Sequence, residues 1–290
     1  MNILEIGGKP PAKPPAAPPT VLKLGGSVLT DESAYRRCAA ALRRRLDESP
    51  EEKLIVVTSA RLGLTDELEQ RARALDSAPP KRALDLLWST GEMQSVALLT
   101  MCLHAIGVDA VGLNVHETGL CVAATQESEP PRLRLQPGIL ARESARHDVV
   151  VVPGFFACAA AGAVTSLGRG GSDLSAVLLA AWLPAARCEL IKDVPGYFDR
   201  DPHRYPDARP LSRLSYARAL RMAADGCDLV QLAAVEAAAR TKTTLVVRDL
   251  EDDATSTCID DREDEVEGIT AACERAFRTI GGRENAVRRT

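Results

Sequence analysis

Short apolar runs and longer stretches with helical spacing alternate along most of the chain. Runs of strand type occupy 20–24, 54–58, 109–113, 149–153, 188–192 and 244–248. Apolar positions three and four residues apart predict helices over 35–46, 66–75, 83–106 with a break at Gly91, and 174–183. Continuous apolar runs are typical of strands buried on both faces, so the alternation predicts an α/β fold with a mainly parallel sheet.

The two ends of the chain lack this alternation. Residues 9–19 hold six of the 18 prolines, which fits either a disordered leader or a ligand for a proline-binding module. Residues 251–267 are rich in acid, and one short amphipathic helix is expected at 269–280. We therefore divide the chain into a leader at 1–19, a folded domain at 20–250 and an acidic tail at 251–290. Within the domain, the polar segment 117–146 is expected to be irregular.

Composition narrows the range of partners. Of the 290 residues, 46% are hydrophobic and 26% charged, which is the balance of a soluble globular protein. The net charge of −4 provides no positive field for nucleic acid, and an aromatic share of 3% is too small for a base-stacking surface. No apolar run approaches the roughly 20 residues that cross a bilayer, and the N-terminus lacks a secretory signal. We therefore expect a cytoplasmic protein with neither a nucleic-acid nor a membrane partner.

The eight cysteines are dispersed along the chain. None forms a Cys-x-x-Cys pair, and no histidine lies at zinc-ligand spacing from them. We expect no protein metal site. In a reducing compartment such cysteines are small buried hydrophobic residues, with a reactive thiol as the alternative.

A first glycine loop, Lys23-Leu24-Gly25-Gly26-Ser27, directly follows the first expected strand. Two glycines there let backbone N–H groups approach an anion closely, the following helix directs its positive end toward them, and the lysine adds a full charge. The loop therefore suits a phosphate, although a Gly-Gly pair can also be a simple tight turn. It is not a Walker loop, because the lysine precedes the glycines.

A second glycine loop, Gly168-Arg169-Gly170-Gly171-Ser172-Asp173, opens the helix expected at 174–183. Ser172 and Asp173 could serve only as helix caps. Arg169 has no capping role among glycines, and its guanidinium can bind a carboxylate or phosphate through two parallel hydrogen bonds. We therefore favour a binding function for this loop.

The motifs together resemble the catalytic domain of the aspartokinases, within the amino-acid-kinase superfamily. The resemblance spans about residues 20–250 and is most specific at the second glycine loop and at Gly91-Glu92-Met93-Gln94-Ser95. The other matching segments are Lys23 to Ser27, Val57 to Ala60 with Gly63 to Thr65, Val152 to Phe155, and Asp193 to Gly196 through Asp201-Pro202.

The resemblance implies a three-layer αβα sandwich around a mainly parallel sheet of about eight strands. It also implies an amino-acid lobe at about 20–150, a nucleotide lobe at about 151–250, and a homodimer. The implied reaction uses ATP and Mg²⁺ to phosphorylate the side-chain carboxylate of L-aspartate or a close analogue. Because aspartokinases usually continue into ACT domains, we also expect feedback control of that type to be missing.

The resemblance assigns roles to individual residues. Lys23 and Asp173 are the expected catalytic residues, with Lys23 balancing charge on the transferred group and Asp173 ordering the reacting centre. The expected substrate-binding residues are Ser59, Thr65, Glu92, Arg169 and Ser172. In this group, Glu92 would accept hydrogen bonds from the substrate ammonium, and Arg169 would bind the α-carboxylate of the substrate. The expected phosphate- and nucleotide-binding residues are Gly25, Gly26, Ser27, Lys192, Asp193, Phe198 and Arg200.

The chain departs from the family pattern on the nucleotide side. Lys192 stands where the family has threonine, Phe198 where it has tyrosine, and His203 where it has arginine. Asp228 stands where the family has a lysine. Lys192 and Arg200 are candidates to restore the lost positive charge. These departures keep a second hypothesis open, in which the chain is a catalytically weak relative that binds an amino acid or nucleotide as a sensor or assembly partner.

Overall fold

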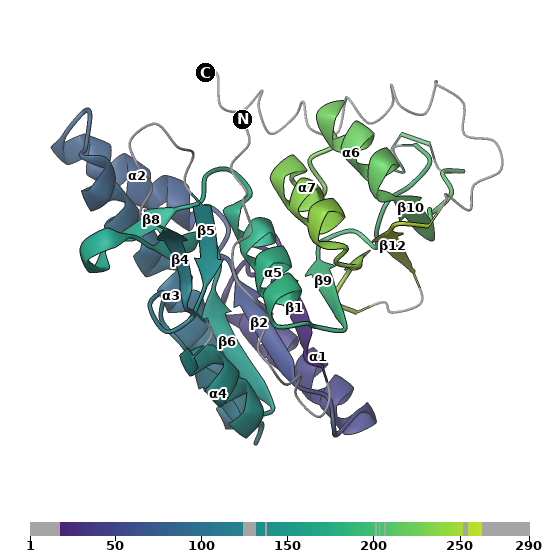
Figure 1. Ribbon diagram of the computed structural model, residues 1–290, viewed down its shortest axis with the longest axis horizontal. Helices are drawn as coiled ribbons and strands as arrows, with labels where there is room; N and C mark the ends of the chain where they lie inside the picture. The colour runs from purple at the N-terminus through teal and green to yellow at the C-terminus, as the bar shows by residue number, and fades with distance from the viewer. Residues whose placement is uncertain are drawn as a thin grey trace.

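The computed structural model describes residues 18–123, 132–136, 138–200, 202, 204–205, 207–251 and 255–262. They form an eight-stranded sheet covered by helices on both faces, with a second, four-stranded sheet beside it (Figure 1). This arrangement confirms the three-layer α/β fold. Within the described ranges, no helix has the length and apolar character needed to cross a bilayer.

The large sheet has the strand order β10-β12-β11-β9-β1-β2-β6-β3. Every neighbouring pair is parallel except β11 and β12. The strands are β1 (Thr20–Leu24), β2 (Leu54–Thr58), β3 (Ala110–Gly112), β6 (Val149–Pro153), β9 (Arg187–Ile191), β10 (Arg213–Ser215), β11 (Leu245–Arg248) and β12 (Ser256–Asp260). Strand β1 is therefore central, with β2 and β9 on either side.

Alternate residues of the central strands face two separate cores. Val21 and Ile55 pack toward α5 (Gly171–Trp182), α6 (Tyr216–Ala224) and α7 (Leu232–Thr241). Leu22 and Val56 pack toward α1 (Glu32–Glu48) and α3 (Lys81–Ala105). Each such side chain contributes about 1.5–3 kcal/mol on full burial, which explains the continuous apolar runs in the sequence.

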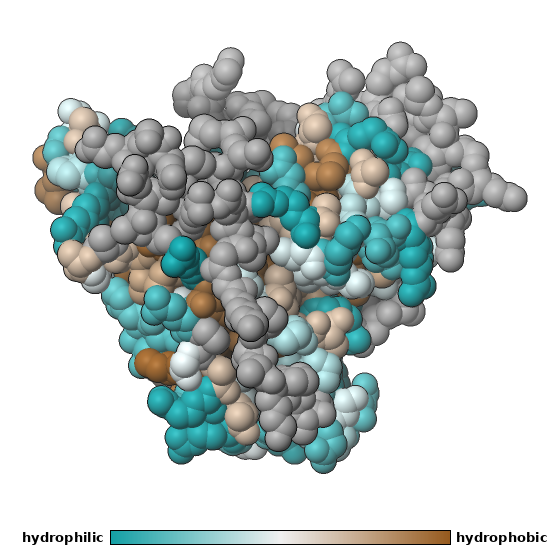
Figure 2. Space-filling model, in the orientation of Figure 1, coloured by the Kyte–Doolittle hydropathy of each residue, from teal (hydrophilic) through white to brown (hydrophobic). Residues whose placement is uncertain are grey.

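The remaining helices lie at the margins. Helix α2 (Leu64–Leu75) packs on α3, and α4 (Gly138–Arg146) contacts β6. On the face shown in Figure 2, apolar residues form small separate groups, including some over α6 and α7. Exposed apolar residues scattered in this way are normal on a folded domain and do not define a binding surface.

The segment expected to be irregular, 117–146, contains regular structure, so that prediction is wrong. It includes β4 (Leu120–Ala123), β5 (Arg132–Leu135) and α4. The two strands join β7 (Phe156–Cys158) and β8 (Val164–Ser166) in the small sheet, whose order is β5-β4-β7-β8. These strands have only three or four residues each, which is too short for the apolar pattern to stand out.

Helix α3 continues through Gly91, so the expected break there is also wrong. Gly91 is buried, and a Cβ at this position would lie 3.0 Å from the Cβ of Ala60. The glycine therefore permits close approach between α3 and the loop after β2, rather than ending the helix.

The sheet also extends further along the chain than the pattern indicated. The strand expected to be the last, β11, is followed by β12, which pairs with it in antiparallel orientation. Strand β10 and helices α6 and α7 were likewise not anticipated. The expected amphipathic helix at 269–280 and most of the expected leader lie outside the described residues.

Candidate active site

A cavity of about 290 Å³ lies where the carboxyl ends of β1, β2 and β9 meet the N-terminus of α5. In parallel α/β sheets this edge is the usual place for a ligand. Seven of the residues singled out from the sequence line it, from both glycine loops and from α3. The lining consists of Lys23, Ser59, Ala60, Thr65, Glu92, Phe155, Gly170, Gly171, Ser172, Asp173, Lys192 and Gln231.

Two lysines share one carboxylate at the base of this cavity. Lys23 Nζ lies 2.8 Å from Asp173 Oδ1, and Lys192 Nζ lies 3.0 Å from Asp173 Oδ2. Asp173 is in the first turn of α5, while Lys23 is on β1 and Lys192 directly follows β9. The three groups carry a net charge of +1, so the centre favours an additional anion.

Burial and charge act in opposite directions on these groups. Burial alone would raise the pKa of the Asp173 carboxyl, but the ammonium groups of Lys192 and Lys23 outweigh it and hold that pKa well below its usual range. For Lys23, burial is the largest effect and lowers its pKa, while Asp173 opposes the shift. Asp173 is therefore ionised at neutral pH and fixes the position of both lysines.

The first glycine loop turns tightly over Lys23. Val28 N donates to Gly25 O at 3.0 Å and Leu29 N to Gly26 O at 3.1 Å. A Cβ on Gly25 would lie 3.1 Å from Lys23 Nζ, and a Cβ on Gly26 would lie 3.0 Å from Ala60 O. A Cβ at Gly26 would therefore crowd the backbone after β2, and one at Gly25 would push against the Lys23 ammonium; an open turn of this kind suits an anion.

Glu92 is buried on α3 with one oxygen unpartnered. Its Oε1 accepts a hydrogen bond from Ala60 N at 3.3 Å, whereas Oε2 has no partner although the residue is only 3% exposed. Burial raises the pKa of the Glu92 carboxyl to about 7, and the backbone hydrogen bonds oppose the shift only in part. A carboxylate held in this state gains from an incoming cation.

Phe155 and Gln231 line the cavity with their side chains and were not assigned a role from the sequence. Phe155 has a left-handed backbone with φ of 66° and packs over Gly171, where a Cβ would lie 2.7 Å from Phe155 Cδ2. Gln231, the residue before α7, packs against Gly170, which has φ of 73°. The sequence signal that could have found Phe155 is its place in the matching segment Val152 to Phe155. Its left-handed backbone, uncommon for a non-glycine residue and often found at a site, is evident only in the structure.

Seven predicted site residues do not line the cavity: Gly25, Gly26 and Ser27 of the first glycine loop, and Arg169, Asp193, Phe198 and Arg200. Arg169 and Asp193 are exposed, and Phe198 pairs with Pro210 through its backbone. Arg200 is held within its own loop, 3.6 Å from Asp199 and 3.5 Å from Asp207. His203 lies outside the described residues, and Asp228 is exposed.

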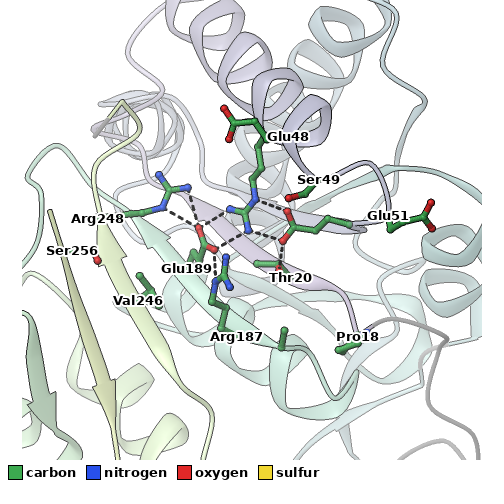
Figure 3. Close-up of a pocket in the computed structure, with 13 residues that line it drawn as sticks. Pro18, Thr20, Glu48, Ser49, Glu51, Arg187, Glu189, Val246, Arg248 and Ser256 are labelled. Atoms are coloured by element: carbon green, nitrogen blue, oxygen red, sulfur yellow. Dashed lines mark hydrogen bonds and ion pairs between the residues drawn. The ribbon is translucent and has the colours of Figure 1, made fainter. Parts of the chain in front are cut away.

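A second, larger concavity of about 740 Å³ lies along α1 near the opposite edge of the sheet. Figure 3 shows Arg187 and Arg248 approaching Glu189 from two sides. Arg45 donates to Glu189 and also to Glu52, with distances between 2.7 and 2.9 Å. These charges satisfy one another, so they tie α1 to β9 and β11 rather than offering a ligand an open group.

The fold is that of an α/β protein with a cavity at the carboxyl edge of a mainly parallel sheet, and comparison with known proteins identifies its family. Residues 18–249 match the model of the Amino acid kinase family, and the chain belongs to this family. It is 38% identical over 236 residues to an aspartokinase of Thermus thermophilus, covering 79% of this chain and 56% of that protein. It is 34% identical over 243 residues to aspartokinase 2 of Bacillus subtilis, and the match covers 83% of this chain and 58% of that protein.

Solved structures agree on the fold. Aspartate kinase from Synechocystis superposes with a TM-score of 0.74 at 31% identity, covering 87% of this chain and 41% of that one. E. coli aspartokinase III in complex with aspartate and ADP superposes with a TM-score of 0.68 at 23% identity. The match covers 85% of this chain and 65% of that one. The chain thus spans about half the length of the sequence relatives above, 56% and 58%.

Proposed function

We propose that this chain transfers the γ-phosphoryl group of ATP to the side-chain carboxylate of L-aspartate or a close analogue. One observation carries the proposal: the unpartnered carboxylate oxygen of Glu92 and the lysine pair on Asp173 belong to the same cavity. The first suits an ammonium group and the second a phosphoryl group. Aspartokinase III, of the same fold, has been solved with aspartate and ADP, which fits this pair of ligands.

The phosphate side of the cavity has some of the groups needed to bind the phosphates of a nucleoside triphosphate. The Gly25-Gly26 turn, Ser27, Lys23 and Lys192 supply backbone donors, a hydroxyl and two positive charges. Mg²⁺ would be bound chiefly through the nucleotide phosphates, because no group of three or more potential metal ligands gathers among the described residues. Asp193 and Phe198 remain candidate contacts for the nucleoside portion.

The acceptor side has complementary groups. Glu92 would accept the substrate ammonium, Ser59, Thr65 and Ser172 would contact its polar atoms, and Phe155 forms an apolar wall. Arg169 would move in from its exposed position to bind the α-carboxylate. The glycines on both sides of Arg169 give that loop the backbone freedom such a movement needs.

For the proposed phosphoryl transfer, the protein has to position the two reactants and neutralise the charge that develops between them. Bound ATP supplies the phosphoryl group, and the acceptor carboxylate is already ionised at neutral pH, so no catalytic base is needed. Lys23 and Lys192 neutralise the charge that develops on the transferred group, and Asp173 keeps both ammonium groups in place. The product is an acyl phosphate.

A hydroxylamine trap tests the proposal. Protein incubated with Mg-ATP, L-aspartate and hydroxylamine should yield aspartyl hydroxamate and ADP in equal amounts. Replacing aspartate by other acidic amino acids defines the acceptor. Hydroxamate from none of them would contradict the proposed reaction.

The alternative, a catalytically weak sensor or assembly partner, is supported by the nucleotide side. Arg200 is engaged by Asp199 and Asp207, and Asp228 places negative charge where the family has a lysine. The same assay separates the two functions when it is combined with calorimetry. Aspartate or ATP binding without turnover would establish the sensor.

The homodimer remains a prediction as well. On α3, Leu99 and Leu103 are buried in the core, whereas Met101 and Ile106 are 63% and 43% exposed. We propose that these exposed residues contribute to a subunit contact. Sedimentation of the full chain measures the oligomeric state directly, and a monomer at all concentrations would refute the dimer.

A further inference from the structure

A pair of cysteines lies across two adjacent strands of the small sheet. Cys121 in β4 and Cys158 in β7 are register partners, and the two strands run parallel. Neighbouring strands are about 4.8 Å apart, within the range of about 4.4–6.8 Å between the Cα atoms of a disulfide. Side chains at paired positions extend from the same face of a sheet, so the two thiols lie side by side at a strand separation that a disulfide accepts.

The two thiols differ in environment. Cys158 is buried and packs with Val115 and Phe156, whereas Cys121 is half-buried at the edge of the same cluster. Burial, followed by the neighbouring Cys121, raises the pKa of the Cys158 thiol to about 11. Cys158 is therefore a poor first nucleophile, and Cys121 is the thiol that a reagent in solution can reach.

A histidine stands beside the buried thiol. His116 Nδ1 lies 3.2 Å from Cys158 Sγ, and the His116 side chain is exposed to solvent. The imidazole can take the proton of Cys158 and release it to water. The cluster thus holds an accessible thiol, a buried partner and a base for that partner.

We propose that Cys121 and Cys158 form a reversible dithiol–disulfide pair that exchanges with small disulfides of the glutathione class. The Cys121 thiolate attacks one sulfur of the small disulfide, forming a mixed disulfide and releasing one small thiol. His116 then takes the proton of Cys158, whose sulfur attacks Cys121 Sγ and displaces the second small thiol. In total, two protein thiols and one small disulfide become one protein disulfide and two small thiols.

The chain carries its own reporter for this exchange. Trp88 packs against the cluster that contains Cys158, and its ring lies 6.2 Å from that of Phe155 in the candidate active site. The only other tryptophan, Trp182, belongs to the core on α5. In a Trp182→Phe background, tryptophan fluorescence therefore reports on the surroundings of the cysteine pair.

The test uses the full chain, treated with oxidised glutathione at pH 8 and mapped by mass spectrometry after alkylation of free thiols. The expected result is a Cys121–Cys158 disulfide that dithiothreitol reverses, and, in the Trp182→Phe chain, a matching change in Trp88 fluorescence. This mapping needs no variant and no enzymatic activity, so it stands or fails separately from the proposed function. A stable glutathione adduct on Cys121 with Cys158 still free, or a bond from Cys121 to another cysteine, would overturn the pairing.

Variants test the assigned roles. Cys158→Ser should stop at the mixed disulfide on Cys121, and His116→Asn should slow ring closure about tenfold or more. Cys258→Ser, which alters a half-buried cysteine on β12, is the matched control and should leave both steps unchanged. Closure in His116→Asn at the unaltered rate would refute the role of the histidine.

Discussion

Lys192 Nζ lies 3.0 Å from Asp173 Oδ2, while the other oxygen of that carboxylate is held by Lys23. The family pattern has no lysine at position 192, and the lysine it has elsewhere is Asp228 in this chain. We propose that Lys192, at the end of β9, supplies this missing positive charge next to the proposed reacting centre.

Replacing Lys192 by methionine should reduce kcat by about 10²–10³, because one of two charges facing the transferred phosphoryl group is lost. Asp173 keeps its partner Lys23, so the fold should survive. The hydroxamate assay measures the effect. Lys53→Met removes a lysine that pairs with Asp148 outside this cavity and should leave kcat unchanged. Equal activity in both variants would exclude a catalytic role for Lys192.

Glu92→Gln should raise the KM for the amino acid about tenfold or more and leave the KM for ATP nearly unchanged. Glutamine retains an acceptor for Ala60 N–H but loses the charge that binds an ammonium group. Since the Glu92 pKa is about 7 without substrate, kcat/KM for the amino acid should also fall below pH 7 in the unmodified protein. Parallel increases in both KM values would argue against this assignment.

Low pH, which should lower kcat/KM through protonation of Glu92, should raise the free energy of unfolding through the same residue. A carboxyl whose pKa is raised to about 7 in the folded chain stabilises the fold most below its usual value of about 4.3, and that contribution is lost as pH rises through 7. Glu92→Gln should therefore resemble the unmodified protein near pH 4 and be the more stable of the two at pH 8. Urea unfolding at both pH values, without substrate, provides the measurement.

Arg169→Lys should raise the KM for the amino acid far more than the KM for ATP. Lysine retains the charge but cannot form the two parallel hydrogen bonds that a guanidinium makes with a carboxylate. Arg169 is exposed, so the folded state without ligands should be unaffected, and unfolding curves serve as the control. Equal changes in both KM values would remove Arg169 from the acceptor site.

Glu189→Gln should destabilise the fold by about 3 kcal/mol at pH 7, since it leaves three guanidinium groups around a neutral side chain. Burial would raise the pKa of Glu189, but Arg45, then Arg248 and Arg187, lower it to about 2. Its stabilisation is present above about pH 4.3 and is lost as pH falls toward 2, so the deficit of the variant should shrink in acid. Glu51→Gln, an exposed change at the same concavity, should alter stability by less than about 0.5 kcal/mol.

Local signals in the sequence predicted most of the fold and seven of the residues that line the cavity. A buried strand followed by glycines placed Lys23 correctly at the carboxyl end of β1, where the cavity lies, because such a turn is determined by adjacent residues. The sequence could not reveal that Asp173 bridges Lys23 and Lys192, because this contact depends on three segments brought together by the sheet. The nucleotide-binding role of Arg200 stays a prediction; in the structure its side chain is engaged by Asp207 and by the Tyr205 ring, both in its own loop.

The small sheet was missed because its order depends on partners distant in sequence. Strand β4 has four residues and pairs with β7, which lies more than 30 residues later. At Gly91 the sequence predicted a break where the helix is in fact continuous. A glycine inside a helix usually weakens it, but here the absent side chain allows α3 to pack against Ala60.

Side chains along β9 point alternately to the two faces of the sheet, and this alternation sets the positions of two separate charge clusters, one around Glu189 and one around Asp173. Glu189 faces the arginines on the α1 side of the sheet, and Lys192, three positions later, faces Asp173 on the α5 side. An insertion or deletion of a single residue between them would send one of the two to the wrong side, and a deletion would bring Asp193 toward Asp173. This strand can therefore tolerate exchange among its apolar residues during evolution but not a change in its length.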